Sequence, residues 1–282
     1  MLIEVIKFIL FAFLIVLISK YILVTYLRKL AESLNLKAKT VGNIAGISTS
    51  VPEFLSITTS SIRDLQSASV YNILSSNIIN LIQYLATIML NKNTHKLKNR
   101  AIIIDMIFVA VTIFIPIILL RLNIELDMFI VPLFLLFYAL FSYLNNSIHK
   151  LYLDNETKET TQRKIDIKKI VGYIATLAIT GIMLYIVGEL LGNSLENLCK
   201  TFNVPQFVVG VLLGFITSIP ELLTFFESQK YNKKEKDEML GVVEATNNLV
   251  ASNTLNLFVI QTIGILILNR WNLQKWTKYG II

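Results

Sequence analysis

The chain contains few of the side chains that build disulfide-stabilised folds and soluble metal sites. Its 282 residues include one cysteine, Cys199, and two histidines. An internal disulfide and a cysteine-cluster metal site are therefore excluded, and a histidine-based zinc site is not expected. Charged residues make up only 16% of the chain, whereas hydrophobic residues make up 54% and the mean hydropathy is +0.63. This composition excludes a soluble globular domain and is typical of an all-α polytopic membrane protein.

Eight segments are apolar and long enough to cross a bilayer, and we expect each to form a transmembrane helix. They are residues 3–26, 40–62, 69–90, 101–121, 127–148, 170–192, 204–228 and 240–268. The hydrophilic gaps after the odd-numbered segments carry four to six Lys and Arg residues each, and those after the even-numbered segments carry one each. The positive residues that give the net charge of +7 are thus distributed as membrane topology requires, and this distribution does not indicate nucleic-acid binding. The positive-inside rule places the N-terminus outside and the loop 149–169 in the cytoplasm.

A polar motif occurs twice inside these apolar segments. Residues 46–55 read GISTSVPEFL and residues 214–223 read GFITSIPELL, so each copy carries one glutamate, Glu53 or Glu221. Each copy is followed by a second match, NILSSNIIN at 72–80 and NLVASNTLN at 248–256. A carboxylate at membrane depth is energetically expensive, and its default interpretation is a role in an ion pathway.

The two copies occupy the second and seventh segments, and because five crossings separate them they run through the membrane in opposite directions. We therefore predict an inverted repeat, an arrangement in which secondary transporters bind their ions near the bilayer midplane. The predicted units are a first repeat over 1–148, a cytoplasmic linker over 149–169, and a shortened second repeat over 170–282. The motif regions within the repeats are 46–80 and 214–256.

The side chains of the duplicated motif favour a hard cation. Pro52 and Pro220 lack an N–H group, so each frees a helical carbonyl that protein, water or an ion must satisfy. The motif supplies hydroxyl, amide and carboxylate oxygens without sulfur or imidazole, a set suited to calcium or sodium and not to zinc or copper. A kinked helix with ordinary interhelical polar contacts would explain either copy alone. The matched, inverted pair favours a binding site.

Three other charged side chains in the apolar segments have a different interpretation. Glu189 and Glu244 have no counterpart in the other repeat, so we expect them at a helix end or in a gate and not among the ion ligands. We expect Lys20, in the first segment, to extend its ammonium group toward the membrane interface. The acidic residues of the linker are expected to face solvent.

At these residues the chain resembles the alpha repeats of the cation/calcium exchanger superfamily, and most closely the prokaryotic sodium/calcium exchangers. The family pattern is G-T-S-x-P-E followed by G-N-x-x-G-S-N-x-x-N or D. The resemblance implies a calcium site formed by Thr49, Glu53, Thr217 and Glu221, with the two glutamates as the charged metal ligands. It implies flanking sodium sites formed by Ser50, Ser76, Asn80, Ser218, Ser252 and Asn256, and it makes the backbone carbonyls of Gly46 and Gly214 further candidates.

The chain departs from the family pattern at several positions. Ser75 and Ala251 replace the glycine before Ser-Asn, so we expect the close backbone packing there to differ. Asn256 stands where close prokaryotic relatives have aspartate, which leaves two carboxylates in the site instead of three. The family has a five-plus-five plan of spans, and the polar residues 269–282 are too short to supply the last two.

The resemblance implies an antiporter that exchanges calcium for sodium by alternating access in the cell membrane, with the first and sixth helices sliding past the others. Proton/calcium exchange, or exchange of another divalent cation, is the alternative. A channel-like membrane protein that binds cations without exchange is a third possibility. Under each hypothesis the protein is not an enzyme, needs no cofactor, and has ions and the lipid bilayer as its partners.

Overall fold

The computed structural model describes residues 1–282 except 35, 37, 123–126, 153–165, 235–237 and 279–282. Every regular element in the described part of the chain is a helix. Seven of these helical stretches are long and apolar enough to cross a membrane, namely Leu2–Ala31, Gln66–Leu90, Arg100–Arg121, Ile130–Ser147, Ile167–Thr201, Gln206–Lys230 and Met239–Asn269. The predicted class, an all-α polytopic membrane protein, is confirmed.

The helices follow one another along the chain in two halves. The first half contains α1 (Leu2–Ile18), η1 (Ser19–Val24), α2 (Thr25–Ser33), α3 (Ala38–Thr49), α4 (Val51–Ile62), α5 (Gln66–Leu90), η2 (Thr94–Lys98), α6 (Arg100–Arg121) and α7 (Ile130–Tyr152). The second half contains α8 (Ile167–Glu196), η3 (Asn197–Thr201), α9 (Gln206–Thr217), α10 (Ile219–Lys234), α11 (Glu238–Leu255), η4 (Asn256–Ile260) and α12 (Gln261–Lys278). The last helix therefore continues past 268, where the sequence predicted the end of the final span.

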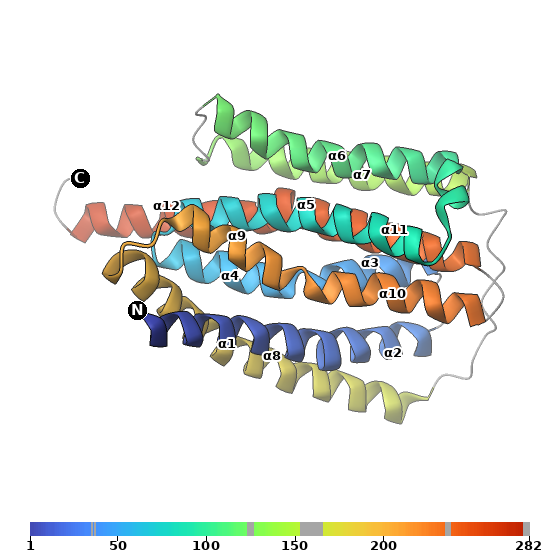
Figure 1. The fold of residues 1–282 in the computed structure, drawn as a ribbon, viewed down its shortest axis with the longest axis horizontal. Coiled ribbons are helices and arrows are strands. Elements are labelled where there is room, and N and C mark those ends of the chain that lie inside the picture. The colour runs from blue at the N-terminus through green and yellow to red at the C-terminus, as the bar shows by residue number, and fades with distance from the viewer. Residues whose placement is uncertain (35, 37, 123–126, 153–165, 235–237, 279–282) are drawn as a thin grey trace.

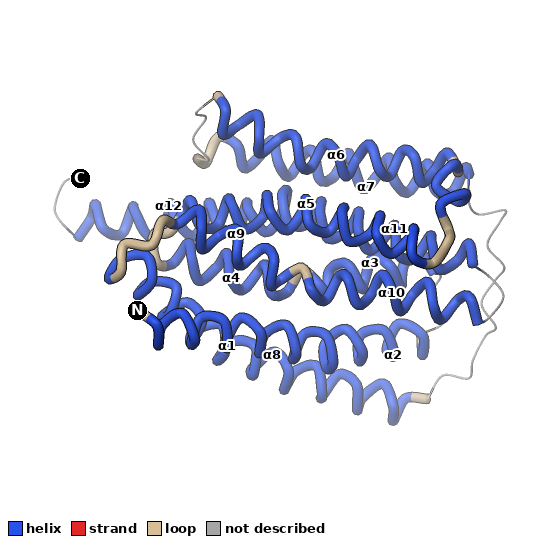
Figure 2. The backbone as a smooth tube through the Cα atoms, viewed as in Figure 1, coloured by secondary structure: helices blue, strands red, loops and turns tan. Residues whose placement is uncertain are grey.

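The second predicted span, 40–62, is present as two helices of 12 residues each, α3 and α4, separated at Ser50. Ser50 has φ −80° and ψ 1°, outside helical geometry, and Pro52 lies in the first turn of α4. The same break separates α9 from α10 at Ser218, with φ −79° and ψ −1° (Figure 2). Proline removes a backbone donor and collides with the preceding turn, which explains why both helices break just before it.

The two broken helices run in opposite directions through the molecule, as Figure 1 shows. Each one contacts the polar helix of the other half: α3 packs against α11, and α9 packs against α5. This exchange of partners confirms the predicted inverted repeat. It places the breaks of both motifs at the centre of the helical bundle, where the helix ends leave backbone groups that side chains or ions can satisfy.

Glycines permit the close approach between these helices. A Cβ atom built at Gly46 would lie 2.7 Å from the Cβ of Ala251 and 2.7 Å from the carbonyl oxygen of Asn248. At Gly214 it would collide with the hydroxyl of Ser75 and the carbonyl of Asn72. The close packing expected to differ at Ser75 and Ala251 is therefore present, because glycines on the opposing helices leave the required space.

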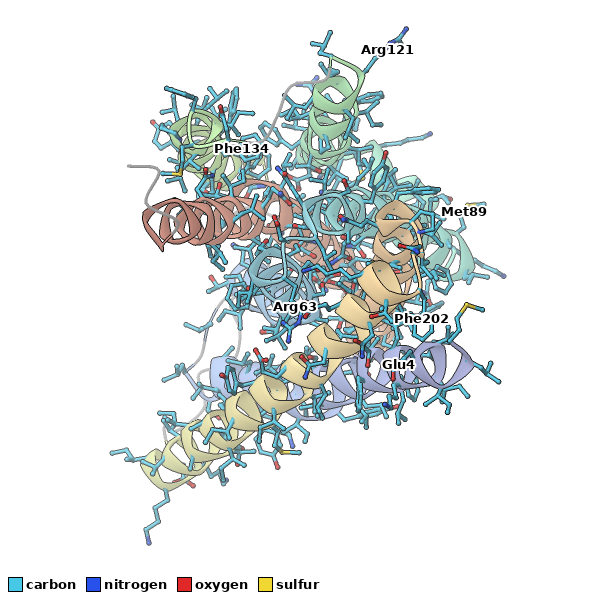
Figure 3. The ribbon with its side chains drawn as sticks, turned by 90° about the vertical axis from the view of Figure 1, so that its left-hand side faces the viewer. Glu4, Arg63, Met89, Arg121, Phe134 and Phe202 are labelled. Carbon is cyan, nitrogen blue, oxygen red and sulfur yellow. The ribbon has the colours of Figure 1, made fainter. Side chains whose placement is uncertain are left out.

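Two helical layers flank this core. Figures 1 and 3 show α6 and α7 on one side, and α1, α2 and α8 on the opposite side. On the first side, α6 packs on α11 and α7 packs on η4. On the opposite side, α1 and α8 pack on each other. There α1 contacts α9 of the core, and α8 contacts α4. The core is thus covered on one face by the α1–α2 and α8 helices that belong to the two different halves.

Candidate cation-binding site

The ten side chains predicted to form the site lie together at the two helix breaks and on α5, α11 and η4. Each is 0% or 1% exposed to solvent. They are Thr49, Ser50, Glu53, Ser76, Asn80, Thr217, Ser218, Glu221, Ser252 and Asn256. Burial of so many polar groups is costly unless they are hydrogen-bonded or bind an ion. Their hydrogen bonds therefore show which atoms are already satisfied.

Ser252 connects both repeats. Its hydroxyl lies 2.9 Å from that of Ser50 and donates to Oε1 of Glu221 at 3.0 Å. The amide of Asn80 donates to the Ser252 hydroxyl at 3.4 Å. One hydroxyl on α11 therefore contacts the first helix break, the second glutamate and the polar face of α5.

A second set of contacts holds α5 to α11 and η4. Asn77 and Asn253 each donate their side-chain amide to the other's backbone carbonyl, at 3.2 Å and 3.1 Å. Asn256 donates to the hydroxyl of Ser76 at 3.5 Å and to Oδ1 of Asn77 at 3.3 Å. The sequence did not assign a role to Asn77 or Asn253, although their place in both Ser-Asn-x-x-Asn matches could have indicated one.

The backbone carbonyls of the two candidate glycines accept hydrogen bonds from their own motifs. The carbonyl of Gly46 accepts from the hydroxyls of Thr49 and Ser50, at 3.2 Å and 2.9 Å, and that of Gly214 accepts from the hydroxyl of Ser218 at 2.7 Å. Each of these carbonyls also accepts a backbone N–H bond across the break, from Ser50 or from Ser218, at 3.2 Å. The side-chain bonds fix the hydroxyl oxygens of the two motifs in place.

Six oxygen atoms of the predicted ligand set are buried and accept no hydrogen bond of normal geometry. They are both carboxylate oxygens of Glu53, Oε2 of Glu221, Oγ1 of Thr217, and Oδ1 of Asn80 and Asn256. Oxygen atoms with unused lone pairs, three of them on the carboxylates of Glu53 and Glu221, match the ligands that calcium and sodium prefer. Within the described residues no three His, Cys, Asp or Glu side chains gather into a metal-binding group, and this site itself has only two carboxylates.

The two glutamates come from opposite repeats and lie close enough to repel each other. Each glutamate also lies next to the threonine of the opposite repeat: Thr217 is next to Glu53, and Thr49 is next to Glu221. Buried like charges are unfavourable unless a counter-charge joins them. One divalent cation, or two monovalent cations, would neutralise the pair.

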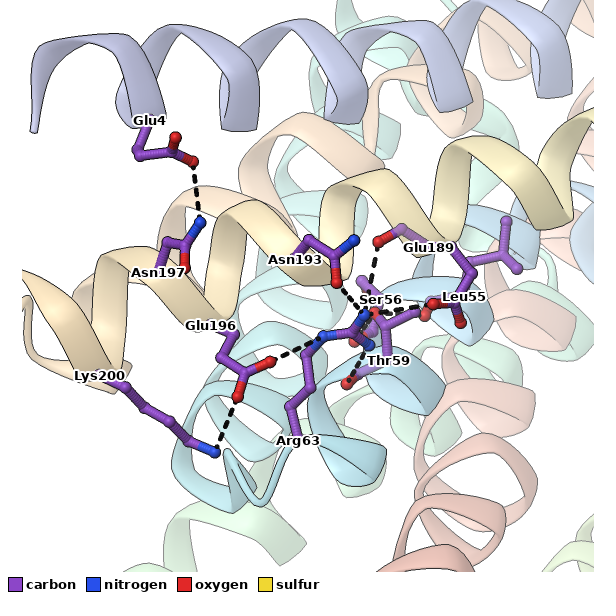
Figure 4. A network of polar contacts seen from close by, with 10 residues as sticks. All are labelled: Glu4, Leu55, Ser56, Thr59, Arg63, Glu189, Asn193, Glu196, Asn197 and Lys200. Carbon is purple, nitrogen blue, oxygen red and sulfur yellow. Dashed lines mark hydrogen bonds and ion pairs between the residues drawn. The ribbon is translucent and has the colours of Figure 1, made fainter.

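Ion pairs link the flanking helices to the core at two places. Figure 4 shows Arg63, at the end of α4, between Glu189 and Glu196 of α8, with Nη2 at 3.3 Å from Glu189 and Nε at 3.4 Å from Glu196. Asn193 accepts a further hydrogen bond from Arg63 at 2.7 Å. Glu189 lies inside α8 and joins that helix to α4 through Arg63, so a role for it in a gate stays a prediction.

In the same flanking layer, charged residues of η1 and α2 pair with the second repeat. Arg28 lies 3.0 Å from Glu244, and Lys20 lies 2.7 Å from Glu227. The prediction that Lys20 reaches the membrane interface is wrong, since its side chain is buried and is turned toward α10. The sequence contained no signal for this pairing because the two residues are far apart along the chain.

Comparisons with known proteins identify the family. The model of the sodium/calcium exchanger protein family matches residues 4–145 and 172–279. The fold is similar to that of the sodium-calcium exchanger NCX_Mj soaked with 10 mM Na+ and zero Ca2+, with a TM-score of 0.54, 20% identity, and coverage of 95% of this chain and 84% of that chain. The same exchanger soaked with 10 mM Na+ and 10 mM Sr2+ gives a TM-score of 0.53 at 21% identity, with coverage of 95% and 83%.

No curated protein matches the sequence at a significant level. The family model nevertheless covers most of the chain in two blocks, one in each half. The residues between the blocks, 146–171, include most of the predicted linker. The chain therefore belongs to the sodium/calcium exchanger protein family, a family of membrane transporters.

Proposed function

We propose that the protein is a secondary active antiporter that exchanges calcium for sodium by alternating access. Family membership supports this function. The observation that carries it is the set of six buried oxygens without hydrogen-bond partners, drawn from both repeats at the centre of the bundle. Such a cluster is stable when cations share it or when its carboxylates take up protons, because an unpaired buried charge costs several kcal/mol.

The proposed calcium ligands are the glutamates and threonines of the two breaks, with the charge supplied by Glu53 and Glu221. Calcium would draw its oxygens to about 2.3–2.6 Å. The proposed sodium ligands surround them and include the hydroxyls and amides that the hydrogen bonds already position. These are Ser50, Ser76, Asn80, Ser218, Ser252 and Asn256. Either one calcium or two sodium ions would balance the two carboxylates.

Alternating access requires one part of the protein to move relative to the site. The proposed moving part is the α1–α2 and α8 layer, which lies on one face of the core and pairs one helix from each repeat. Ion pairs at Arg63 and at Lys20 join this layer to α4 and α10, so they would break or change partners when it slides. The two repeats would then be 1–148 and 170–282, joined by the segment 149–169.

Orientation follows from the charge of the loops. We place the protein in the cell membrane with the N-terminus outside and the 149–169 segment in the cytoplasm. Most of that segment lies outside the described residues.

The test is calcium flux in sealed vesicles that contain the purified protein. Calcium uptake should follow an imposed outward sodium gradient and stop when the gradient is collapsed. The Glu53→Gln, Glu221→Gln double variant is the matched control, since it keeps the side-chain shapes and removes both charges. Uptake that ignores sodium but follows a pH gradient would replace the proposal with proton/calcium exchange. Calcium entry without any counter-ion, with single-channel currents, would indicate a channel.

A further inference from the structure

Asn77 and Asn253 are buried asparagines at equivalent places in the two repeats, and neither belongs to the predicted ligand set. Both are 0% exposed. Each follows the serine of its own motif match and stands three residues before a predicted ligand, Asn80 or Asn256. A buried amide needs hydrogen-bond partners for its N–H donors and for its oxygen. The partners of these two amides indicate their role.

Backbone carbonyls fix the orientation of both amides. Asn77 donates its side-chain N–H to the carbonyl of Asn253 at 3.2 Å, and Asn253 donates to the carbonyl of Asn77 at 3.1 Å. A backbone carbonyl can only accept a hydrogen bond, so the nitrogen of each amide must face it. The other polar atom of each amide, Oδ1, is therefore left to accept from a different neighbour.

These two Oδ1 atoms orient the asparagines of the candidate site. Asn256 donates to Oδ1 of Asn77 at 3.3 Å, and Asn80 donates to Oδ1 of Asn253 at 3.1 Å. An oxygen acceptor holds the nitrogen of the facing amide and not its oxygen. In agreement with this, Oδ1 of Asn80 and Oδ1 of Asn256 are both buried without a hydrogen-bond partner.

The serines of the opposite repeats supply a further acceptor to each site amide. The side-chain nitrogen of Asn80 lies 3.4 Å from the hydroxyl of Ser252, and that of Asn256 lies 3.5 Å from the hydroxyl of Ser76. Both hydroxyls donate their own hydrogen to another oxygen, so here they accept. The nitrogen of each site asparagine is thus held by protein groups, and only its oxygen remains for a cation.

We propose that Asn77 and Asn253 are positioning residues of the transport site, which hold the amides of Asn256 and Asn80 with the oxygen, and not the nitrogen, available to the bound cation. This inference rests on the proposed function. A site asparagine turned by half a rotation about its Cβ–Cγ bond would present N–H donors to the cation, and the cation would lose an oxygen ligand. An aspartate needs no such support, because both of its terminal atoms are oxygens.

The experiment measures equilibrium binding of calcium to the purified protein in detergent without sodium. Asn77→Ala should raise the calcium Kd by roughly tenfold, as is typical when a partner that orients a metal ligand is removed. Asn253→Ala should raise it to a similar extent through Asn80. Neither change removes the backbone carbonyl that holds the other asparagine, so each variant releases one site amide only.

The aspartate variants Asn256→Asp and Asn80→Asp supply a crossed rescue. In the Asn256→Asp background, Asn77→Ala should change the Kd by less than about twofold, because the ligand no longer needs orienting. In the Asn80→Asp background, Asn77→Ala should still raise the Kd by roughly tenfold. Asn253→Ala should show the reverse pattern, with rescue by Asn80→Asp and not by Asn256→Asp.

A purely structural role gives a different result. If the two asparagines only join α5 to α11, their removal would raise the Kd equally in both aspartate backgrounds. That pattern, or an unchanged Kd in the two single variants, would overturn the inference while leaving the proposed function in place. Asn93→Ala is the matched control, because Asn93 is also buried and donates to another amide, that of Gln229, at 3.1 Å. Its Kd should stay within about twofold of that of the unmodified protein.

Failure to bind calcium in the unmodified protein would overturn the proposed function and this inference together. Gel-filtration elution verifies the fold of each variant. If Asn77→Ala does not fold, Asn77→Leu takes its place, since leucine has almost the shape of asparagine and neither polar atom. The Asn253 variants test the inference independently, and the absence of crossed rescue in either pair overturns it.

Discussion

The two glutamates of the duplicated motif have almost the same local sequence but different surroundings. Glu221 accepts a hydrogen bond from the hydroxyl of Ser252 at 3.0 Å. Glu53 accepts no hydrogen bond of normal geometry at either oxygen. The equivalent serine of the first repeat, Ser76, donates instead to the carbonyl of Ile73 in its own helix at 3.1 Å.

This difference shows that an inverted repeat does not give two equal half-sites. The second carboxylate accepts a hydrogen bond from Ser252, whereas neither oxygen of the first accepts one of normal geometry. A buried charge without partners destabilises the fold more than one with a hydrogen bond. The two halves should therefore respond differently to the same substitution, and four experiments test whether they do.

The largest effects are expected from Glu53→Gln and Glu221→Gln. Each removes one of the two charges that balance calcium, so each should abolish sodium-driven calcium uptake in vesicles. In calcium- and sodium-free detergent solution, Glu53→Gln should raise the melting temperature more than Glu221→Gln, because it removes the less compensated charge. Glu189→Gln and Glu244→Gln should retain most of the uptake. Normal uptake by Glu53→Gln would show that the site is assigned wrongly.

The next largest effect concerns the two glycines at the crossed helix contacts. Gly214→Ala and Gly46→Ala should each destabilise the protein by about 1–3 kcal/mol, because each new methyl group meets a backbone carbonyl of the opposing helix. Ser75→Gly should partly rescue Gly214→Ala, since Ser75 is the side chain that the methyl meets. Thermal unfolding in detergent measures the effect. Gly181→Ala is the control, since a Cβ there meets nothing within 4 Å.

A smaller effect is expected from the two serines. Ser252→Ala removes the hydroxyl that connects Ser50, Asn80 and Glu221, and should weaken calcium binding by roughly tenfold, corresponding to a buried hydrogen bond of about 1–2 kcal/mol. Ser76→Ala should have less effect, since its hydroxyl donates within its own helix. Calcium binding in detergent provides the comparison. Equal losses in the two variants would show that the half-sites are equivalent after all.

The smallest effect is expected from Asn256→Asp. This change should leave folding almost unaltered and should change how calcium uptake depends on sodium and on pH. Oδ1 of Asn256 is buried without a partner, so a third carboxylate there should strengthen sodium or proton competition with calcium several-fold. Asn80→Asp is the matched change in the first half, where Oδ1 is also without a partner. The measurement is calcium uptake as a function of sodium concentration and pH. No change in either dependence would show that Asn256 does not line the site.

The sequence by itself determined the membrane class, the duplicated motif and its inversion. These properties are local or additive: apolar segments partition into the bilayer along their whole length, and an interior proline removes a backbone donor and crowds the preceding turn, although α6 continues through Pro116. The breaks at Ser50 and Ser218 accordingly lie beside Pro52 and Pro220. The burial of all ten predicted site residues at one place also follows, since an inverted repeat brings its two motifs to a common centre.

Only the tertiary structure decided which side chains meet across the helices. Lys20 with Glu227, Arg63 with Glu189, and Ser252 with Glu221 are pairs whose spacing along the chain carries no periodic signal. Their contacts depend on where two helices cross and which rotamer fits the crossing, and neither can be read from the residues alone. The matching motifs therefore predict two equal half-sites, and the packing of their neighbours makes them unequal.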